Sequence, residues 1–168
     1  TIEFRDTLME ETGETANLGI EKDGNVLFLS QVETHAPIRA FFPPGTLSPL
    51  HASGIGKALL AQYSDAKLEK FIKTDLESFT PHTKATLKLL QSDIQITLAR
   101  GYAVDDQERN LGMRCIAAPI KNAFGEVIAG ISVSGPTSRV ASDKVQTFAK
   151  SVINAAINVS AAMGADIE

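Results

Sequence analysis

Several features that would indicate particular classes of protein are missing from this sequence. Only one cysteine, Cys115, occurs in 168 residues, so no disulfide can form within the chain, which suits a reducing compartment. No apolar run approaches the ~20 residues that a membrane helix needs, and no signal-peptide pattern opens the chain. We therefore expect a cytoplasmic protein that has no membrane partner.

An excess of basic residues is also missing. The chain has 16 lysines and arginines against 20 acidic residues, and no basic cluster stands out. Because neutralisation of phosphate charge supplies most non-specific affinity for nucleic acids, we do not expect this chain alone to bind DNA or RNA. Its hydrophobic content of 43% is ordinary for a folded globular protein, and its length fits one domain.

The first 45 residues predict one helix followed by antiparallel sheet. A helical pattern is stopped by Gly13, and two alternating runs flank Asp23-Gly24, a dipeptide typical of a hairpin turn. A third run ends at a Pro-Pro-Gly sequence, which interrupts regular structure. The expected elements are a helix over 2–14 and strands over 15–21, 25–33 and 37–42.

The rest of the chain predicts helices, then a second set of strands, then a closing helix. Ser64 and Ser142 are expected to cap helices, and Gly101 is expected to end one. A Gly-containing connection over 122–125 joins two apolar runs as a β-hairpin. The expected helices cover 54–63, a segment after Ser64, 84–100 and a segment after Ser142; the expected strands cover 102–104, 113–121 and 126–134. This order predicts an α+β fold with an antiparallel sheet covered by helices.

The strand over 126–134 has two different faces. Alternation places Val127, Ala129, Ile131 and Val133 on one face, and Ile128, Gly130, Ser132 and Ser134 on the other. The first is a core face. The second ends in two hydroxyls and carries small residues that leave room above the sheet. With Cys115 on the partner strand and Asp105 upstream, it predicts a pocket for a small polar molecule.

Four motifs carry a resemblance to a known family. They are Leu50-His51-Ala52-Ser53-Gly54-Ile55-Gly56-Lys57-Ala58, Gly101-Tyr102-Ala103-Val104-Asp105 with Glu108, Gly112-Met113-Arg114-Cys115-Ile116-Ala117, and Ser132-Val133-Ser134-Gly135-Pro136. In these motifs the chain resembles the effector-binding domain of the isocitrate lyase regulator (IclR) family of bacterial transcription factors.

The resemblance implies a GAF-like, profilin-like domain with a central antiparallel sheet flanked by helices. It also implies a ligand-sensing domain that forms homodimers or homotetramers and is not an enzyme. Since the chain begins at Thr1, we expect a piece of a longer protein. Residues 1–14 would end an interdomain linker helix and residues 15–168 would form the effector-binding domain. Operator DNA would be bound only by a winged helix-turn-helix domain that precedes this chain.

The expected effector is a small organic acid, with glyoxylate or pyruvate as first choice and larger sugar or aromatic acids as second. Its carboxylate is expected on the backbone N–H groups of Gly54 and Ile55 at a helix start and on the hydroxyls of Ser132 and Ser134. Asp105 and Cys115 would contact a keto or hydroxyl oxygen, the role of Asp105 being implied by the resemblance. Leu111 and Met113 are candidates for an apolar pocket wall.

The sequence disfavours sites for nucleotides, metals and cofactors. A P-loop would need glycine at position 51 and a hydroxyl residue at position 58, which are His51 and Ala58, and Leu59 replaces the third glycine of a dinucleotide fingerprint. The three histidines, His35, His51 and His82, lack the spacing of zinc ligands. We therefore expect neither a metal nor a cofactor.

Simpler alternatives remain open for several of these residues. Gly54 and Gly56 would equally serve tight packing of a helix on the sheet. Asp106 and Glu108 are expected as solvated surface carboxylates, and Arg114 either enters the pocket or faces solvent. Cys115 is either a pocket residue or the nucleophile of a small redox or hydrolytic enzyme, which would need a nearby base and a lowered thiol pKa.

Overall fold

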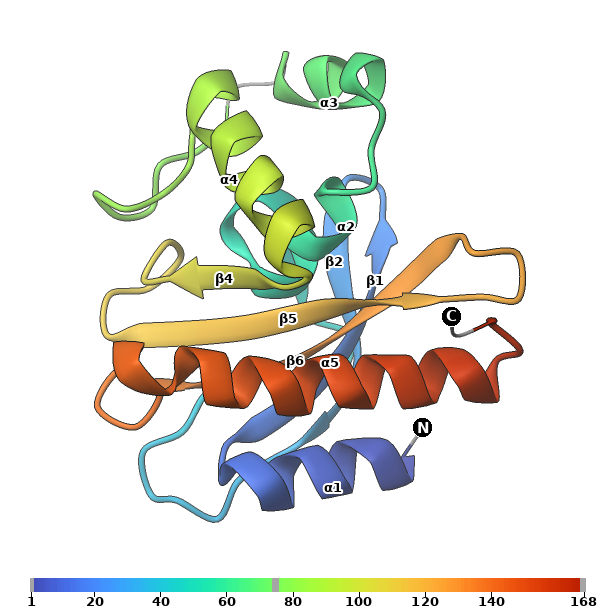
Figure 1. Ribbon diagram of the computed structural model, residues 1–168. Helices are drawn as coiled ribbons and strands as arrows, with labels where there is room; N and C mark the ends of the chain where they lie inside the picture. Colours follow the sequence, from blue (N-terminus) through green and yellow to red (C-terminus); the bar gives the residue numbers. More distant parts are fainter. Residues whose placement is uncertain (1, 74–75, 167–168) are drawn as a thin grey trace.

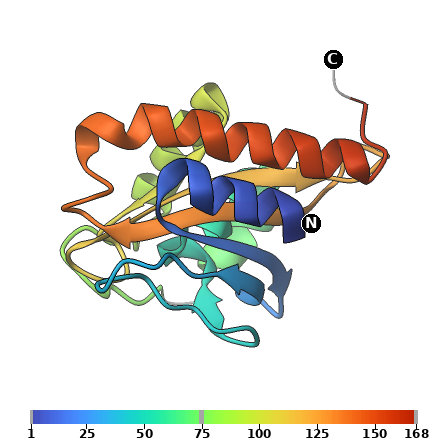
Figure 2. The same ribbon diagram turned by 90° about the horizontal axis from the view of Figure 1, so that it is seen from below.

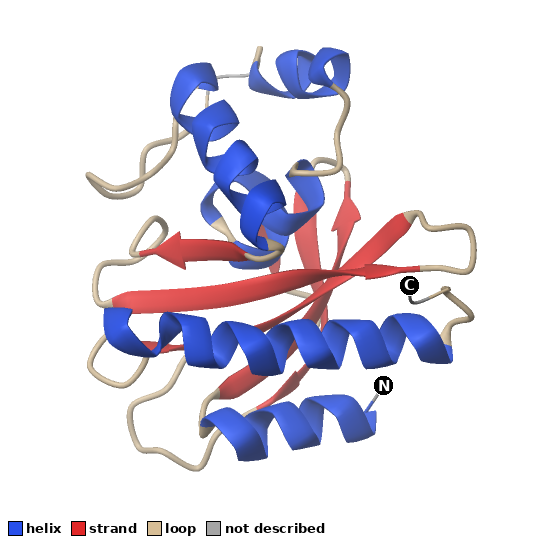
Figure 3. Cartoon of the chain, viewed as in Figure 1, coloured by secondary structure: helices blue, strands red, loops and turns tan. Residues whose placement is uncertain are grey.

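The computed structural model describes residues 2–73 and 76–166 and has the predicted α+β architecture (Figure 1, Figure 3). Within these residues, six strands form one antiparallel sheet in the order β3-β2-β1-β6-β5-β4. The strands are β1 (Thr15–Lys22), β2 (Asn25–Val32), β3 (Leu47–Pro49), β4 (Ala103–Asp106), β5 (Met113–Lys121) and β6 (Val127–Pro136). The helices are α1 (Ile2–Thr12), α2 (Gly54–Leu60), α3 (Asp65–Ile72), α4 (Leu87–Arg100) and α5 (Val145–Ala162), with short 3-10 turns η1 (Leu50–Ala52) and η2 (Ser142–Lys144).

Helices cover both faces of the sheet. Figure 2 shows α1 and α5 over one face, where they pack on the side chains of β5 and β6 that include Ile116, Ile131 and Val133. On the opposite face, α2 and α4 enclose a second core that includes Ile55, Leu60 and Leu90. Among the described residues, no helix combines the length and the apolar character needed to cross a membrane.

The turn signals at the start of the chain are confirmed. Gly13 ends α1 with a positive φ of 73°, and its N–H donates to the carbonyl of Met9 at 2.7 Å. Asp23 and Gly24 both have positive φ, 50° and 79°, as a two-residue hairpin turn requires. The β1–β2 hairpin follows within one residue of the predicted bounds.

The predicted strand over 37–42 is wrong. The free edge of β2 is occupied instead by the chain that leads into β3, where the N–H of Phe28 donates to Thr46 and the N–H of Gly45 donates back to Phe28. The segment before it is fixed by side chains: the hydroxyl of Thr15 and the amide of Gln31 both donate to the carbonyl of Ala40. Residues 37–42 therefore form a loop that is held by side-chain hydrogen bonds rather than a strand of the sheet.

Helix caps are partly as predicted. Ser64 caps α3 by accepting from the N–H of Lys67 at 3.2 Å, and Gly101 ends α4 with φ 85°. However, α4 begins at Leu87 because Thr86 caps it. The predicted cap at Ser142 is wrong, since this residue begins the turn η2 and makes no cap hydrogen bond to α5.

The faces of β6 agree with the prediction except at one end. Ala129, Ile131 and Val133 pack toward α5, but the register between β5 and β6 shifts so that Ile120 pairs with Ala129 and Lys121 with Val127. This bulge at Ile128 reverses the two residues before Ala129: Ile128 packs with the α5 core and Val127 with the α2 core. Alternation along one strand cannot predict such a shift.

Candidate ligand-binding site

The strand register aligns polar side chains from four strands in one row. Thr15 lies opposite Ser134, Ser134 opposite Cys115, and Cys115 opposite Asp105. Ser132 lies two residues from Ser134, on the same face of the sheet. The predicted convergence of Asp105, Cys115, Ser132 and Ser134 is thus present, although Asp105 lies within β4 rather than after a strand.

These four side chains line one cavity together with the start of α2. The further lining residues are Phe28, Phe42, Ser48, Ala52, Ser53, Gly54, Ile55, Arg109, Asn110 and Met113. Leu111, predicted as a wall residue, is 64% exposed and does not line the cavity. The space inside is about 10 Å³, roughly what one water molecule needs. A ligand of several heavy atoms therefore requires wall side chains to move, and the unbranched Met113 is the most adaptable of them.

Small residues allow α2 to approach the sheet closely. A Cβ atom at Gly54 would lie 3.3 Å from Cβ of Cys115, and one at Gly130 would lie 2.8 Å from Cγ2 of Ile55. A Cβ atom at Gly56 would lie only 2.2 Å from the carbonyl oxygen of Leu50. The helix–sheet packing considered for both glycines is therefore present at Gly54, which brings the first turn of α2 over Cys115, whereas Gly56 packs against the backbone of η1.

The first turn of α2 presents backbone donors at the cavity. Ser53 caps this turn: its hydroxyl accepts from the N–H of Gly56 at 3.2 Å, and its carbonyl accepts from the N–H of Lys57 at 2.9 Å. Gly54 and Ile55 come before these two donors in the chain, and their N–H groups have no acceptor among the described residues. Both residues line the cavity, so an incoming carboxylate could accept from these N–H groups.

Asp105 is a carboxyl group held in an unfavourable environment. Burial and the neighbouring charge of Glu108 raise its pKa from 3.8 to about 7. Hydrogen bonds from the backbone N–H groups of Glu108 and Arg109 and the charge of Lys57 act in the opposite direction; the bond from Glu108 is 2.8 Å long. Near neutral pH Asp105 is therefore present in both protonation states, so it can donate to or accept from a ligand oxygen.

Cys115 has the character of a pocket thiol rather than a nucleophile. It is 5% exposed, and burial together with the charge of Asp105 raises the pKa of its thiol. Reactive cysteines require the opposite shift, because the thiolate is the nucleophile. Cys115 can serve as a weak hydrogen-bond donor in the cavity.

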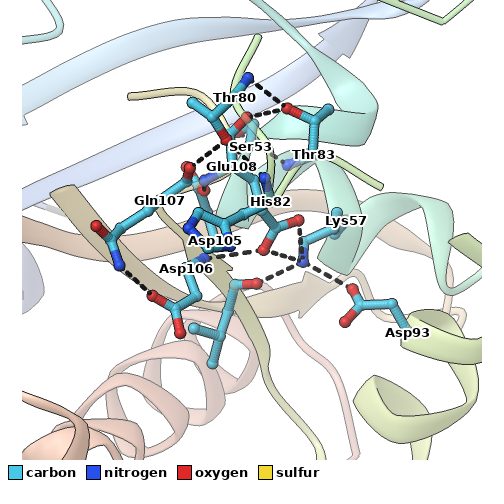
Figure 4. A network of polar contacts seen from close by, with 12 residues as sticks. Ser53, Lys57, Thr80, His82, Thr83, Asp93, Asp105, Asp106, Gln107 and Glu108 are labelled. Atoms are coloured by element: carbon cyan, nitrogen blue, oxygen red, sulfur yellow. Dashed lines mark hydrogen bonds and ion pairs between the residues drawn. The ribbon is translucent and has the colours of Figure 1, made fainter. Parts of the chain in front are cut away.

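A buried ion-pair network lies behind the cavity, and sequence reasoning missed it (Figure 4). Lys57 of α2 is fully buried, and its ammonium contacts Asp93 at 2.7 Å, Glu108 at 2.9 Å and the carbonyl oxygen of Val104. Burial lowers the pKa of Lys57, but the two carboxylates more than offset this and raise it overall. The signal in the sequence was a single lysine inside the otherwise apolar helix Gly54–Leu60.

This network corrects the prediction for Glu108, which is 2% exposed rather than a solvated surface residue. Besides Lys57, its carboxylate accepts from the N–H of Asp106 at 2.8 Å. The hydroxyls of Thr80 and Thr83 donate to the carbonyls of Gln107 and Glu108, each at 2.6 Å (Figure 4). The loop that carries the cavity residues Arg109 and Asn110 is thus held both through the carboxylate of Glu108 and through two of its backbone carbonyls.

Arg114 follows neither alternative considered for it. Its guanidinium is buried, pairs with Asp106 at 2.8 Å and donates to the carbonyl of Val140 at 2.6 Å. It therefore lies outside the cavity and is not solvated, whereas Asp106 keeps 53% of its side chain exposed, as expected of a surface carboxylate.

The histidines do not gather into a metal site. His51 donates from Nε2 to the carbonyl of Glu77 at 2.8 Å and stacks on Phe79, so it supports the loop before α4. In the described part of the chain, no three side chains of histidine, cysteine, aspartate and glutamate come together as metal ligands would.

Comparisons with known proteins agree with this geometry. A family model described as "Bacterial transcriptional regulator IclR C-terminal" matches residues 3–161. The HTH-type transcriptional regulator BhcR of Paracoccus denitrificans is 55% identical over 157 residues, which cover 93% of this chain and 56% of that protein. The transcriptional repressor IclR of Escherichia coli is 41% identical over 160 residues, covering 94% of this chain and 58% of that protein. The chain thus spans less than two thirds of the length of these relatives.

Solved structures of similar proteins share the fold. The Thermotoga maritima IclR superposes with a TM-score of 0.91 at 26% identity, covering 97% of this chain and 66% of that one. The C-terminal domain of the E. coli transcriptional regulator KdgR superposes with a TM-score of 0.83 at 29% identity, covering 97% and 98% of the two chains. The relatives are named as transcriptional regulators and repressors, which gives no support to the enzyme alternative for Cys115.

Proposed function

The chain belongs to the IclR family of bacterial transcriptional regulators, and from this premise we propose that its cavity senses a small organic acid. Binding of the acid would control how a separate N-terminal domain binds operator DNA. The relatives are named as HTH-type regulators and are longer than this chain, which supports a winged helix-turn-helix domain before it. In this proposal, residues 1–14 end an interdomain linker helix and residues 15–168 form the effector-binding domain.

The observation that carries the proposal is the cross-strand row beneath the start of α2. Ser132 and Ser134, both buried, offer hydroxyl donors from the sheet, and Gly54 and Ile55 offer N–H donors from above. Several neutral donors at a helix start stabilise one negative charge, so this end of the cavity suits a carboxylate. We place the carboxylate there.

Asp105 and Cys115 would contact the other end of the acid. Because Asp105 is partly protonated near neutral pH, it can donate to a keto oxygen or accept from a hydroxyl group. The small volume of the cavity favours two- and three-carbon acids, so glyoxylate and pyruvate remain our first choice. Sugar acids and aromatic acids would need a much larger rearrangement of the walls.

The regulator is proposed to act in the cytoplasm as a homodimer or homotetramer. An acid can change DNA affinity only if it binds one arrangement of the domains better than another. Couplings between sites of this kind are typically ~1–3 kcal/mol. The acid, a second copy of the chain and operator DNA are thus the expected partners.

A thermal-shift screen of the 168-residue chain against small carboxylic acids tests this function. An acid at ~100 times its Kd should add roughly 2.7 kcal/mol of stability. Ser134→Ala and Asp105→Ala should weaken binding about tenfold or more, since each removes a hydrogen bond to a charged or polar ligand group. Ser142→Ala, at an exposed position, is the matched control. No shift with any acid, or equal shifts in all variants, would contradict the proposal.

A further inference from the structure

A buried asparagine, Asn17, lies beside the two serines of the cavity. Asn17 of β1 lies opposite Ser132 of β6 and is fully buried. It occupies the sheet face that α2 covers, because it alternates with Ala16, which packs in the core beneath α5. Asn17 does not itself line the cavity. Any effect on a ligand must therefore pass through the serines.

The amide of Asn17 contacts both serine hydroxyls. Its Nδ2 donates to Oγ of Ser132 at 3.5 Å and to Oγ of Ser134 at 3.4 Å. A hydroxyl group carries one hydrogen and two lone pairs. When each oxygen accepts from Asn17, the hydrogen of each serine must go to another acceptor. The side chain of Ser134 also makes a hydrogen bond with that of Cys115, and both serines line the cavity, where a ligand can accept from them.

Only the nitrogen of this amide has hydrogen-bond partners. Among the described residues, Oδ1 of Asn17 meets no hydrogen-bond donor. Its other cross-strand neighbour, Gln31, has its amide nitrogen on the carbonyl of Ala40 and its amide oxygen on the N–H of Phe42. A buried polar atom without a partner destabilises a fold, and asparagine is disfavoured in strands. An apolar residue would serve packing better, so stability does not explain Asn17.

We infer that Asn17 is a positioning residue that sets the hydrogen-bonding polarity of the cavity, which deepens the proposed function and rests on it. By donating to both serines, it makes their hydroxyls donors toward the ligand and so selects an anionic group. An acceptor at position 17 would reverse the arrangement: the serines would donate to residue 17 and present lone pairs to the ligand. Such a cavity would favour a ligand group that donates, such as an amide.

Binding of pyruvate and of its neutral amide, pyruvamide, to position-17 variants tests this inference by calorimetry. The unaltered chain should prefer pyruvate. In Asn17→Asp the side chain keeps its shape but presents oxygens to both serines. Pyruvate should then bind about tenfold or more weakly, the effect of losing a hydrogen bond to a charged group, while pyruvamide keeps or gains affinity. The ratio of the two affinities should reverse or approach one.

Two further variants separate polarity from charge and from folding. Asn17→Leu has no donor and no charge, so its ratio of pyruvate to pyruvamide affinity should be intermediate. This variant can be measured even if the buried carboxylate of Asn17→Asp prevents folding. Asn25→Asp adds the same charge at the β1–β2 hairpin, beside Asp23, and should leave the ratio unchanged.

An equal loss of affinity for both ligands in the Asn17 variants would overturn the inference, because a residue that only supports the fold affects both ligands alike. The proposed function is tested by the unaltered chain: if it binds neither compound, the assignment of a small acid fails, and the role of Asn17 fails with it. If it binds pyruvate and the ratio stays constant in the variants, only the role of Asn17 fails.

Discussion

Replacing Asp105 with asparagine should stabilise the domain at pH 8, although Asp105 lies in the proposed site. The folded-state pKa of Asp105 is raised from 3.8 to about 7 by burial and by the charge of Glu108. A carboxyl group whose pKa is raised by folding binds its proton more tightly in the folded chain. Its contribution to stability is therefore fully present below about pH 4 and is lost as the pH rises toward 7.

The size of the effect follows from the shift. A rise of about 3 pKa units corresponds to ~4 kcal/mol, at 1.36 kcal/mol per unit. Asparagine keeps an oxygen that can accept from the N–H of Glu108, as Asp105 does at 2.8 Å. Its amide hydrogens must be satisfied in the same buried place, which costs ~1–3 kcal/mol where they are not. We therefore expect a net gain of about 1–3 kcal/mol at pH 8.

Urea denaturation of the two chains from pH 4 to pH 8 measures this gain. The difference in free energy of unfolding, Asp105→Asn minus unaltered, should rise with pH through this range and be zero or negative at pH 4. The exposed Asp143 provides the control, since Asp143→Asn should show no such slope. A difference that does not change with pH, or one that falls between pH 4 and pH 8, would show that folding does not raise the pKa of Asp105.

Three further predictions concern the surroundings of the site. Lys57→Met should lower the free energy of unfolding by ~3–5 kcal/mol because it leaves buried Glu108 without its cation. Adding Glu108→Gln should recover most of that loss, whereas a loss below ~1 kcal/mol in urea denaturation would contradict the buried ion pair. Gly56→Ala should cost about 1–3 kcal/mol because its Cβ would lie 2.2 Å from the backbone oxygen of Leu50, and an unchanged melting temperature would show that η1 adapts. The thiol of Cys115, buried and with a raised pKa, should react with a disulfide reagent at pH 8 far more slowly in the folded chain than in urea; equal rates would rule out this environment.

The sequence predicts those parts of the fold that depend on local chemistry. Asp23-Gly24, Gly13 and Gly101 adopt positive φ where turns and helix ends were expected, because few residues tolerate that conformation. Alternation along β6 also placed Ser132 and Ser134 on one face, and the hairpin placed Cys115 on the neighbouring strand. The positions of these residues follow from the neighbouring sequence alone and do not depend on distant segments.

What the sequence did not predict depends on contacts between distant segments. Residues 37–42 form a loop that is held by the side chains of Thr15 and Gln31, and the bulge at Ile128 depends on the partner strand. The burial of Glu108 depends on Lys57, 51 residues earlier. Each of these features depends on which distant segment a residue contacts, and a local sequence pattern does not carry that information.

A crystal structure of this chain grown with pyruvate or glyoxylate would show whether the cavity binds a small acid and in which orientation. The proposed function predicts that the acid occupies the cavity beneath α2. Its carboxylate oxygens should lie within hydrogen-bond distance of the hydroxyls of Ser132 and Ser134 and of the N–H groups of Gly54 and Ile55, and its other oxygen should face Asp105. An acid bound elsewhere on the chain, or bound in the cavity with its carboxylate toward Asp105, would contradict it.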